Sequence, residues 1–285
     1  MSTIFVVVHG IRPKPERDVL KASCLHFLQK STEIKLEPEQ VRLAYWADIA
    51  GHPEIPDDRG TFKKFNFVEL GTIASFGIFR KSAVDIMESR LAAILNRAED
   101  PNASAIVQLL AGTIGVLSDP IAGKIMRGFI RDVYVYFKRG IREQVKDRLR
   151  QELAAVPKGT RVVLIGHSLG SVVALDTLLS DNIKVDWLLT MGSPLGFNAV
   201  QAKLAYQPEA YAALPTKAPV WHNLFDLLDI VSLDYDLADD FPAGAPNDVA
   251  IRNQFAYSNG ERNRHGLYGF LGNRETGDLI RAFLE

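Results

Sequence analysis

A short turn of small residues joins an apolar strand to an apolar helix near the middle of the chain, and it restricts the fold more than any other feature. The turn, GHSLG at residues 166–170, follows the run RVVLI and precedes SVVALDTLL. A G-x-S-x-G turn in this setting is sharp and holds its central serine in a strained backbone conformation. It also sets the serine hydroxyl at the positive end of the helix that follows. The segment therefore predicts a nucleophile elbow with Ser168 as the nucleophile.

The two outer glycines of this turn have a steric role. Side chains two positions before and two positions after the serine would collide with neighbouring backbone, which glycine avoids. The residues that we expect to support the nucleophile in the turn are Gly166, His167 and Gly170.

The rest of the chain alternates β-branched apolar runs with helical patterns. The expected strands are residues 3–8, 41–46, 161–165, 185–191, 220–225 and 249–257, and the expected helices flanking them are 16–31, 171–179 and 275–285. Strands that alternate with helices imply an α/β fold with a doubly wound, mostly parallel sheet and helices on both faces. A length of 285 residues fits one such domain over residues 1–285 with a sizeable insertion.

Residues 61–156 form the expected insertion, because they have helical patterns throughout and almost no strand signal. Helices are expected at 84–98 and 132–156, and apolar stretches at 68–79 and 103–117. Three interpretations stay open for this block: helices that bury one another, a cap over a lipid-like substrate, or peripheral contact with a membrane or partner surface.

The elbow and the strand pattern resemble the α/β-hydrolase superfamily, particularly its lipase and esterase branches, over residues 1–50 and about 158–285. The resemblance implies the chain order serine, acid, histidine for a catalytic triad. It also implies a serine esterase that needs no metal and no organic cofactor, with a small-molecule ester or lipid-like substrate.

Two histidines follow Ser168 and compete for the role of general base. His222 lies within the expected strand 220–225, so we expect it to be packed or to face solvent. His265 lies in a loop after the last expected strand and before the final helix, which is where the superfamily carries its base. We therefore predict His265 as the base that activates Ser168.

Three aspartates after the strand 220–225 compete for the role of acid: Asp226, Asp229 and Asp234. The segment Asp229-Ile230-Val231 is similar to a lipase-like D-P-V pattern, with isoleucine in place of proline. On this alignment Asp229 is the triad acid and Asp226 caps or pairs nearby, although Asp226 remains the alternative acid. The acid orients the histidine tautomer and stabilises the imidazolium.

An oxyanion hole requires two backbone N–H donors near the nucleophile. One is expected from Leu169, directly after the serine. The resemblance places the other in the loop after strand 3–8, where His9 and Gly10 allow the backbone to turn and Ile11 supplies the N–H. The segment MGSP at 191–194 contains Ser193, for which both a pocket-lining and a purely structural role stay open.

Charge and cysteine content exclude several classes of protein. Thirty-three basic and 34 acidic residues give a net charge of −1, which argues against nucleic-acid binding. The single cysteine, Cys24, rules out an intrachain disulfide and a cysteine metal cluster. The N-terminal apolar run is too short for a secretory signal, and no stretch has the ~18 apolar residues of a membrane span. We therefore expect a soluble, cytoplasmic protein.

Two other functions remain open on the same residues. An acyltransferase or a thioesterase would use the same triad. A non-catalytic member of the superfamily would instead bind a lipid or a partner through the helical block. A pH–rate profile separates the enzymes from the binder, because a triad loses activity when its histidine is protonated.

Overall fold

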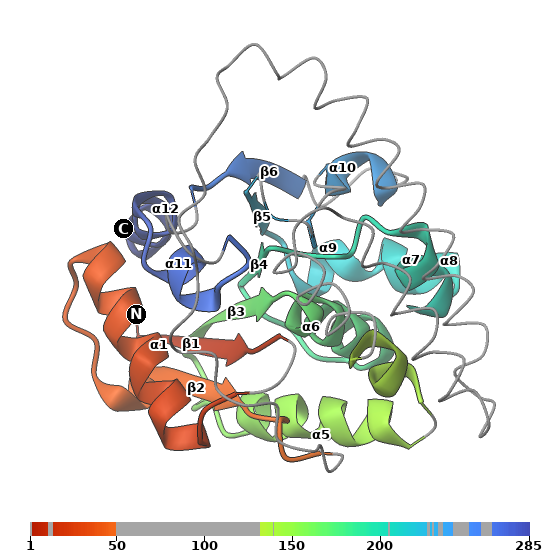
Figure 1. The fold of residues 1–285 in the computed structure, drawn as a ribbon, viewed down its shortest axis with the longest axis horizontal. Coiled ribbons are helices and arrows are strands. Elements are labelled where there is room, and N and C mark those ends of the chain that lie inside the picture. The colour runs from red at the N-terminus through yellow and green to blue at the C-terminus, as the bar shows by residue number, and fades with distance from the viewer. Residues whose placement is uncertain are drawn as a thin grey trace, which may run out of the picture.

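A computed structural model describes residues 2–10, 14–49, 132–138, 140–204, 206–226, 229, 231–232, 236–241, 251–257 and 264–285. Several predictions fall outside these residues: the oxyanion donor Ile11, the helix 84–98 and the apolar stretches 68–79 and 103–117. Within the described part, one sheet carries helices on both of its faces (Figure 1).

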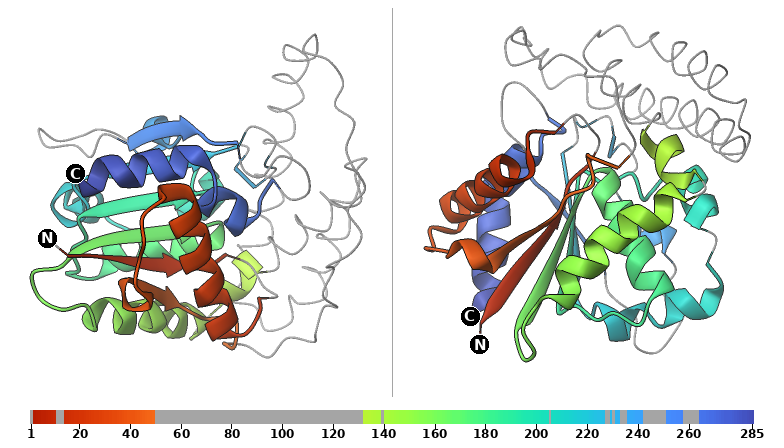
Figure 2. Two further views of the ribbon diagram at one scale, coloured as in Figure 1. Left: turned by 90° about the vertical axis from the view of Figure 1, so that its left-hand side faces the viewer. Right: turned by 90° about the horizontal axis from the view of Figure 1, so that it is seen from below.

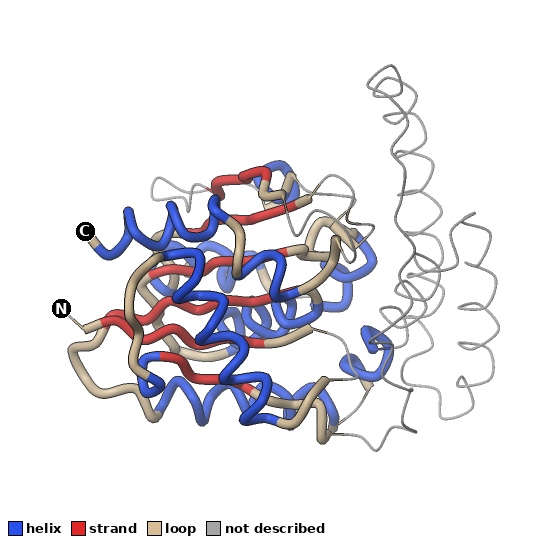
Figure 3. Tube along the Cα trace, turned by 60° about the vertical axis from the view of Figure 1, so that its left-hand side comes forward, coloured by secondary structure: helices blue, strands red, loops and turns tan. Residues whose placement is uncertain are grey.

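The sheet has six strands in the order β2-β1-β3-β4-β5-β6, and every neighbouring pair is parallel. Figure 3 shows the strands lying side by side as a single sheet. The strands are β1 (Thr3–Val8), β2 (Val41–Ala44), β3 (Arg161–His167), β4 (Trp187–Met191), β5 (Trp221–Phe225) and β6 (Ile251–Phe255). The predicted parallel α/β sheet is therefore confirmed.

Side-chain alternation along β1 builds a separate core on each face of the sheet. Val6 and Val8 belong to one hydrophobic cluster, and Phe5 and Val7 belong to the other. Successive side chains of a strand point to opposite faces, so a strand that is buried on both sides is apolar throughout. This is why β1 consists of an unbroken run of β-branched and aromatic residues after its first position.

The helices divide between the two faces (Figure 2). One face is covered by α1 (Arg17–Thr32), α11 (Leu267–Leu271) and α12 (Arg274–Leu284). The other face is covered by α5 (Ile141–Ala154), α6 (Leu169–Ser180), α7 (Asn198–Leu204), α8 (Pro208–Ala212), α9 (Leu214–Lys217) and α10 (Leu237–Asp240). A 3-10 turn, η1 (Pro38–Gln40), precedes β2.

The single helix expected over residues 132–156 is wrong, because two helices occupy this range. Residues 132–137 are helical, and α5 begins only at Ile141. Gly140 separates them with a φ of 85°, a left-handed conformation that glycine adopts without a steric penalty. Val145 and Leu149 of α5 are buried in the core against the sheet, so this part of the expected insertion belongs to the layer that covers the sheet.

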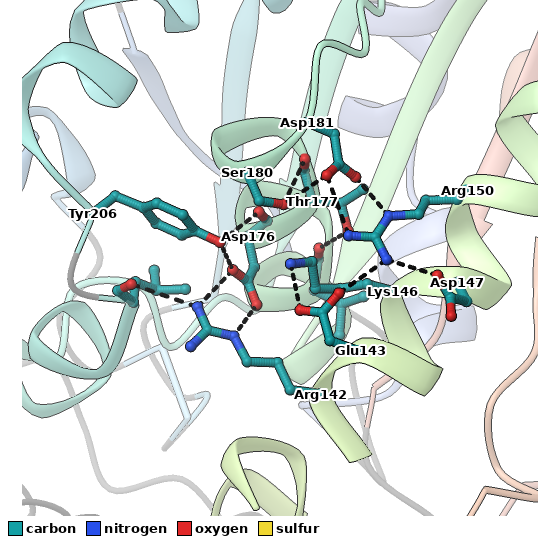
Figure 4. Close-up of polar contacts among 12 residues, drawn as sticks. Arg142, Glu143, Lys146, Asp147, Arg150, Asp176, Thr177, Ser180, Asp181 and Tyr206 are labelled. Atoms are coloured by element: carbon teal, nitrogen blue, oxygen red, sulfur yellow. Dashed lines mark hydrogen bonds and ion pairs between the residues drawn. The ribbon is translucent and has the colours of Figure 1, made fainter. Parts of the chain in front are cut away.

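A buried carboxylate on helix α6 joins this layer together (Figure 4). Asp176 accepts hydrogen bonds from Nε and Nη2 of Arg142, both at 2.7 Å, and from the hydroxyl of Tyr206 at 2.7 Å. The hydroxyl of Tyr136 also donates to it. Burial alone would raise the pKa of Asp176, but the bonds and charge of Arg142, together with the two tyrosine hydroxyls, outweigh burial and lower it. A charged Asp176 therefore fixes α5 and residues 132–137 against α6.

Candidate active site

The backbone at Ser168 has the strained conformation that the elbow motif predicts. Its φ is 56° and its ψ is −131°, and Glu33 is the only other described non-glycine residue with a positive φ. Ser168 stands between the last residue of β3 and the first residue of α6, and its N–H donates to the carbonyl of Met191 at 2.9 Å. The strain is thus held by the neighbouring strand β4.

The glycines of the elbow lie where a side chain would meet backbone. A Cβ on Gly166 would stand 2.6 Å from Cα of Ser171, and a Cβ on Gly170 would overlap the carbonyl oxygen of Val8. These contacts let α6 pack closely on β3 and β1. The steric role expected for both glycines agrees with this geometry.

Ser168, His265 and Asp229 form a continuous chain of hydrogen bonds. Oγ of Ser168 lies 2.7 Å from Nε2 of His265, and Nδ1 of His265 lies 2.8 Å from Oδ2 of Asp229. A carboxylate can only accept, so Nδ1 carries the proton and Nε2 is left to accept from the serine hydroxyl. Asp229 and His265 are 1% and 6% exposed, respectively. This arrangement can move a proton from Ser168 to His265 within a nearly dry site.

The parallel sheet brings these three residues to one edge. Asp229 follows β5 and His265 precedes α11, and the carboxyl ends of parallel strands meet at the same edge of a sheet. The carboxylate of Asp229 is oriented further, because its Oδ1 accepts the N–H of Val231 at 2.9 Å.

Gly192, directly after β4, passes close to Asp229, a contact that the sequence does not predict. It has a φ of 53°, and a Cβ there would lie 2.8 Å from Oδ2 of Asp229 and 3.3 Å from Nδ1 of His265. Only glycine fits this close approach. The glycine is visible in the MGSP turn at residues 191–194, but nothing in the sequence shows that this turn faces Asp229.

The alternative acid and the alternative base lie elsewhere. The carboxylate of Asp226 faces the guanidinium of Arg264 at 3.4 Å, whereas Asp234 lies outside the described residues. His222 is packed in the core, where its Nδ1 accepts from the indole N–H of Trp187 at 2.9 Å. Burial, together with the charge of Arg252, lowers the pKa of His222 to about 4. The structure therefore brings Asp229 and His265 to Ser168, and neither Asp226 nor His222.

His167, the residue before Ser168, contacts His265. Its Nε2 donates to the carbonyl of His265 at 2.8 Å, so Nε2 carries a proton. Burial, followed by the charge of the neighbouring His265, holds the pKa of His167 well below its usual range. Its Nδ1 has no hydrogen-bond partner within the part of the chain that the structure describes.

The loop after β1 meets the elbow at Gly10. A Cβ on Gly10 would stand only 2.5 Å from Cβ of Ser168. His9 holds this loop, because its Nδ1 donates to the carbonyl of Gly10 at 2.9 Å and its Nε2 accepts the N–H of Trp46 at 3.1 Å. The indole of Trp46 stacks on the His9 ring with centroids 5.1 Å apart. The predicted donor Leu169 is the first residue of α6, directly after the serine.

Ser193 has a structural contact in the turn after β4. Its Oγ lies 2.7 Å from Oγ of Ser171 and accepts the N–H of Leu195 at 3.2 Å. Ser171 in turn donates to the carbonyl of Ser168 at 2.6 Å. The two hydroxyls therefore connect the turn after β4 to the elbow, a role for Ser171 that the sequence analysis did not find.

No group of three or more histidine, cysteine, aspartate or glutamate residues in the described part of the chain is arranged to hold a metal ion. Likewise, none of the helices in the described ranges is long and apolar enough to cross a membrane. The carboxylate of Asp236 caps α10 by accepting the backbone N–H of Ala238.

Comparison with known families defines the class of protein. Residues 92–206 match the family model of the class 3 lipases, a range that includes β3, Ser168, α6 and β4. Together with the parallel sheet, this match places the chain in the lipase-like α/β-hydrolase superfamily. It indicates, in general terms, a hydrolase of lipase type that acts on ester bonds. Neither the curated proteins nor the solved structures include a match to the chain.

Proposed function

We propose that this protein is a serine hydrolase that cleaves carboxylic esters through an acyl-enzyme on Ser168. The observation that carries the proposal is the hydrogen-bond chain from Asp229 through His265 to Ser168, with distances of 2.8 Å and 2.7 Å. A serine hydroxyl is a weak nucleophile at its free pKa, and it needs a base in hydrogen-bond reach. His265 supplies that base.

Acylation begins when Ser168 attacks the ester carbonyl and its proton passes to Nε2 of His265. The imidazolium that forms is stabilised by the carboxylate of Asp229, which stays ionised. When the tetrahedral intermediate collapses, the C–O bond breaks and His265 returns the proton to the departing alcohol. Ser168 is then esterified by the acyl group.

The negative charge of the tetrahedral intermediate needs backbone donors. The N–H of Leu169 lies in the first turn of α6, where the helix dipole also favours negative charge. The second donor in this proposal is the N–H of Ile11, directly after Gly10. Two contacts support it: the close approach of Gly10 to Ser168, and the bond from His9 that fixes the carbonyl of Gly10.

Deacylation repeats these steps with water as the nucleophile. His265 removes a proton from a water molecule, which attacks the acyl carbonyl, and the acid leaves as Ser168 recovers its proton. The low exposure of His265 and Asp229 keeps bulk water away from the proton path.

The test is labelling of the purified protein with a fluorophosphonate, followed by peptide mass spectrometry. Labelling is expected at Ser168, and it should be lost in Ser168→Ala and reduced in His265→Ala. Ser180→Ala is the matched control, because Ser180 lies at the far end of the same helix and should leave labelling unchanged. A folded protein that resists the reagent and hydrolyses no ester would contradict the proposal.

A panel of esters and thioesters of increasing acyl length then defines the substrate class. Preference for oxygen esters over thioesters supports the esterase, and the reverse supports a thioesterase. Activity that rises with acyl length is expected if residues 61–156 cap a lipid-like substrate. Acetyl and butyryl esters as the best substrates would contradict that cap.

A further inference from the structure

An ion pair joins the two loops that carry Asp229 and His265. Oδ2 of Asp226 lies 3.4 Å from Nη1 of Arg264, and Arg264 directly precedes His265. The side chain of Asp226 is 1% exposed and that of Arg264 is 15% exposed. Because the pair is largely shielded from solvent, its electrostatic attraction is screened less than that of a surface ion pair.

Asp226 contacts both sides of the candidate triad. Its backbone carbonyl accepts the N–H of Asp229 at 2.9 Å, which closes the turn that presents the acid. Its side chain contacts Arg264, the residue before His265. The backbone and the side chain of one residue therefore connect the acid loop to the base loop.

Arg264 is also held from a second side. Its Nη2 lies 3.2 Å from the hydroxyl oxygen of Tyr257, and its guanidinium lies over the Tyr257 ring, 4.5 Å from the centroid. The carbonyl of His265 receives the bond from Nε2 of His167 at 2.8 Å. The side chain of residue 264 and the carbonyl of residue 265 are thus both restrained, which limits the positions open to the imidazole.

From this geometry we infer that Asp226 and Arg264 are positioning residues, which hold His265 in reach of Ser168 by joining the base loop to the acid loop. The inference rests on the proposed hydrolase function. Proton transfer requires heavy-atom distances of about 3 Å, and a displacement of about 1 Å costs on the order of 100-fold in rate. Neither side chain bonds the imidazole, so both act through the loops.

The experiment compares Asp226→Asn, Arg264→Gln and the double variant. The values of kcat and KM are measured on a p-nitrophenyl ester, and kcat is expressed per active site titrated with fluorophosphonate. Each single variant is expected to lower kcat roughly 10-fold to 100-fold with little change in KM. The double variant should be no worse than the worse single variant, because loss of either partner already breaks the connection.

Two further variants separate positioning from stability. Arg264→Lys keeps the charge, so it should recover part of the kcat lost in Arg264→Gln. Asp181→Asn removes a more exposed ion pair away from the triad, in which Oδ2 of Asp181 lies 2.7 Å from Nε of Arg150. It should leave kcat unchanged. If Asp226→Asn and Arg264→Gln lower only the melting temperature and leave kcat per titrated site intact, the inference is overturned.

Proton NMR tests the positioning role of Asp226 and Arg264 without measuring turnover. The Nδ1 proton shared by His265 and Asp229 should give a downfield signal, which broadens or disappears in Arg264→Gln and Asp226→Asn but not in Asp181→Asn. If the wild-type protein hydrolyses no ester and this signal is still lost in the variants, the positioning role stands and the proposed function fails. If signal and kcat are both retained, the function stands and the positioning role fails. Should Asp226→Asn not fold, Arg264→Gln alone decides, because its side chain is partly exposed.

Discussion

Gly10 approaches Ser168 so closely that a Cβ on Gly10 would stand 2.5 Å from Cβ of the serine. The same atom would lie 3.0 Å from the carbonyl oxygen of His167. Real Cβ atoms do not approach other atoms to 2.5 Å, so any side chain at residue 10 must displace either the loop after β1 or the nucleophile. The closest contact between these two parts of the site therefore depends on the absence of a single methyl group.

Gly10→Ala is expected to damage activity more than stability. The added methyl group must shift Ser168 or the loop, and a shift of about 1 Å lowers kcat/KM on the order of 100-fold. Overpacking of this kind costs about 1–3 kcal/mol in the free energy of unfolding. Ester hydrolysis and urea unfolding measure the two effects.

Gly159→Ala is the control for this variant. Gly159 has a φ of 78° and nothing within 4 Å of the position that a Cβ would take. Its substitution should cost roughly 1–2 kcal/mol through the left-handed backbone and leave kcat/KM unchanged. Full activity of Gly10→Ala would show that the loop after β1 takes no part in the reaction.

Asp229→Asn is expected to lower kcat by on the order of 10³-fold to 10⁴-fold, with a much smaller change in KM. An amide group is able to donate to Nδ1 of His265, which favours the tautomer that cannot accept the proton of Ser168. The value of kcat and the rate of fluorophosphonate labelling should decrease together. A variant with near wild-type kcat would mean that another acid orients His265.

Stability should fall as the pH is lowered, because a buried histidine resists protonation. The pKa of His222 is lowered from 6.5 to about 4 in the folded protein. Between these two values the unfolded chain binds a proton that the folded protein does not. The stabilisation that neutral His222 gives the folded protein is therefore complete above pH 6.5 and is lost progressively below it.

Urea unfolding at a series of pH values measures this effect. His222→Gln keeps an acceptor for the indole of Trp187 but cannot titrate in this range. Its free energy of unfolding should depend less steeply on pH, by up to about 1.4 kcal/mol per pH unit. Equal slopes for the two proteins would exclude His222 as a source of acid sensitivity.

Asp176→Asn is expected to destabilise the protein by about 3–5 kcal/mol, because it leaves the guanidinium of Arg142 without its carboxylate partner. The pair lies on the face of the sheet covered by α5 and α6, away from the hydrogen bonds of the triad, so kcat per titrated site should be unchanged. Asp181→Asn removes a more exposed pair and should cost about 1 kcal/mol or less. Thermal unfolding measures the stability of the two variants, and active-site titration normalises kcat. Equal losses of stability in Asp176→Asn and Asp181→Asn would contradict a dominant role for burial of the carboxylate.

Several elements of the fold could be predicted from local sequence. The strand 3–8 was predicted with the bounds that β1 has, and the expected helix 16–31 differs from α1 by one residue at each end. The break at Gly140 was missed, because the charged amphipathic pattern continues on both sides of it. A single glycine is tolerated within many helices, so pattern alone does not mark this break.

The conformation of Ser168 also follows from local sequence. A strand, a tight turn with glycine on each side and a helix leave one backbone solution, since any larger residue at 166 or 170 would collide with Ser171 or Val8. Steric exclusion of this kind acts over a few residues, and it can be recognised from the string of amino acids.

The partners of Ser168 depend on contacts between distant parts of the chain. His265 is 97 residues from Ser168, and the sequence alone offers three aspartates as partners for its Nδ1: Asp226, Asp229 and Asp234. In the folded protein, Asp229 lies against His265 and Asp226 faces Arg264. Spacing along the chain carries no information about which of two carboxylates three residues apart faces a ring 36 residues further on. That choice depends on burial and on the hydrogen bonds that the folded loops make to each other.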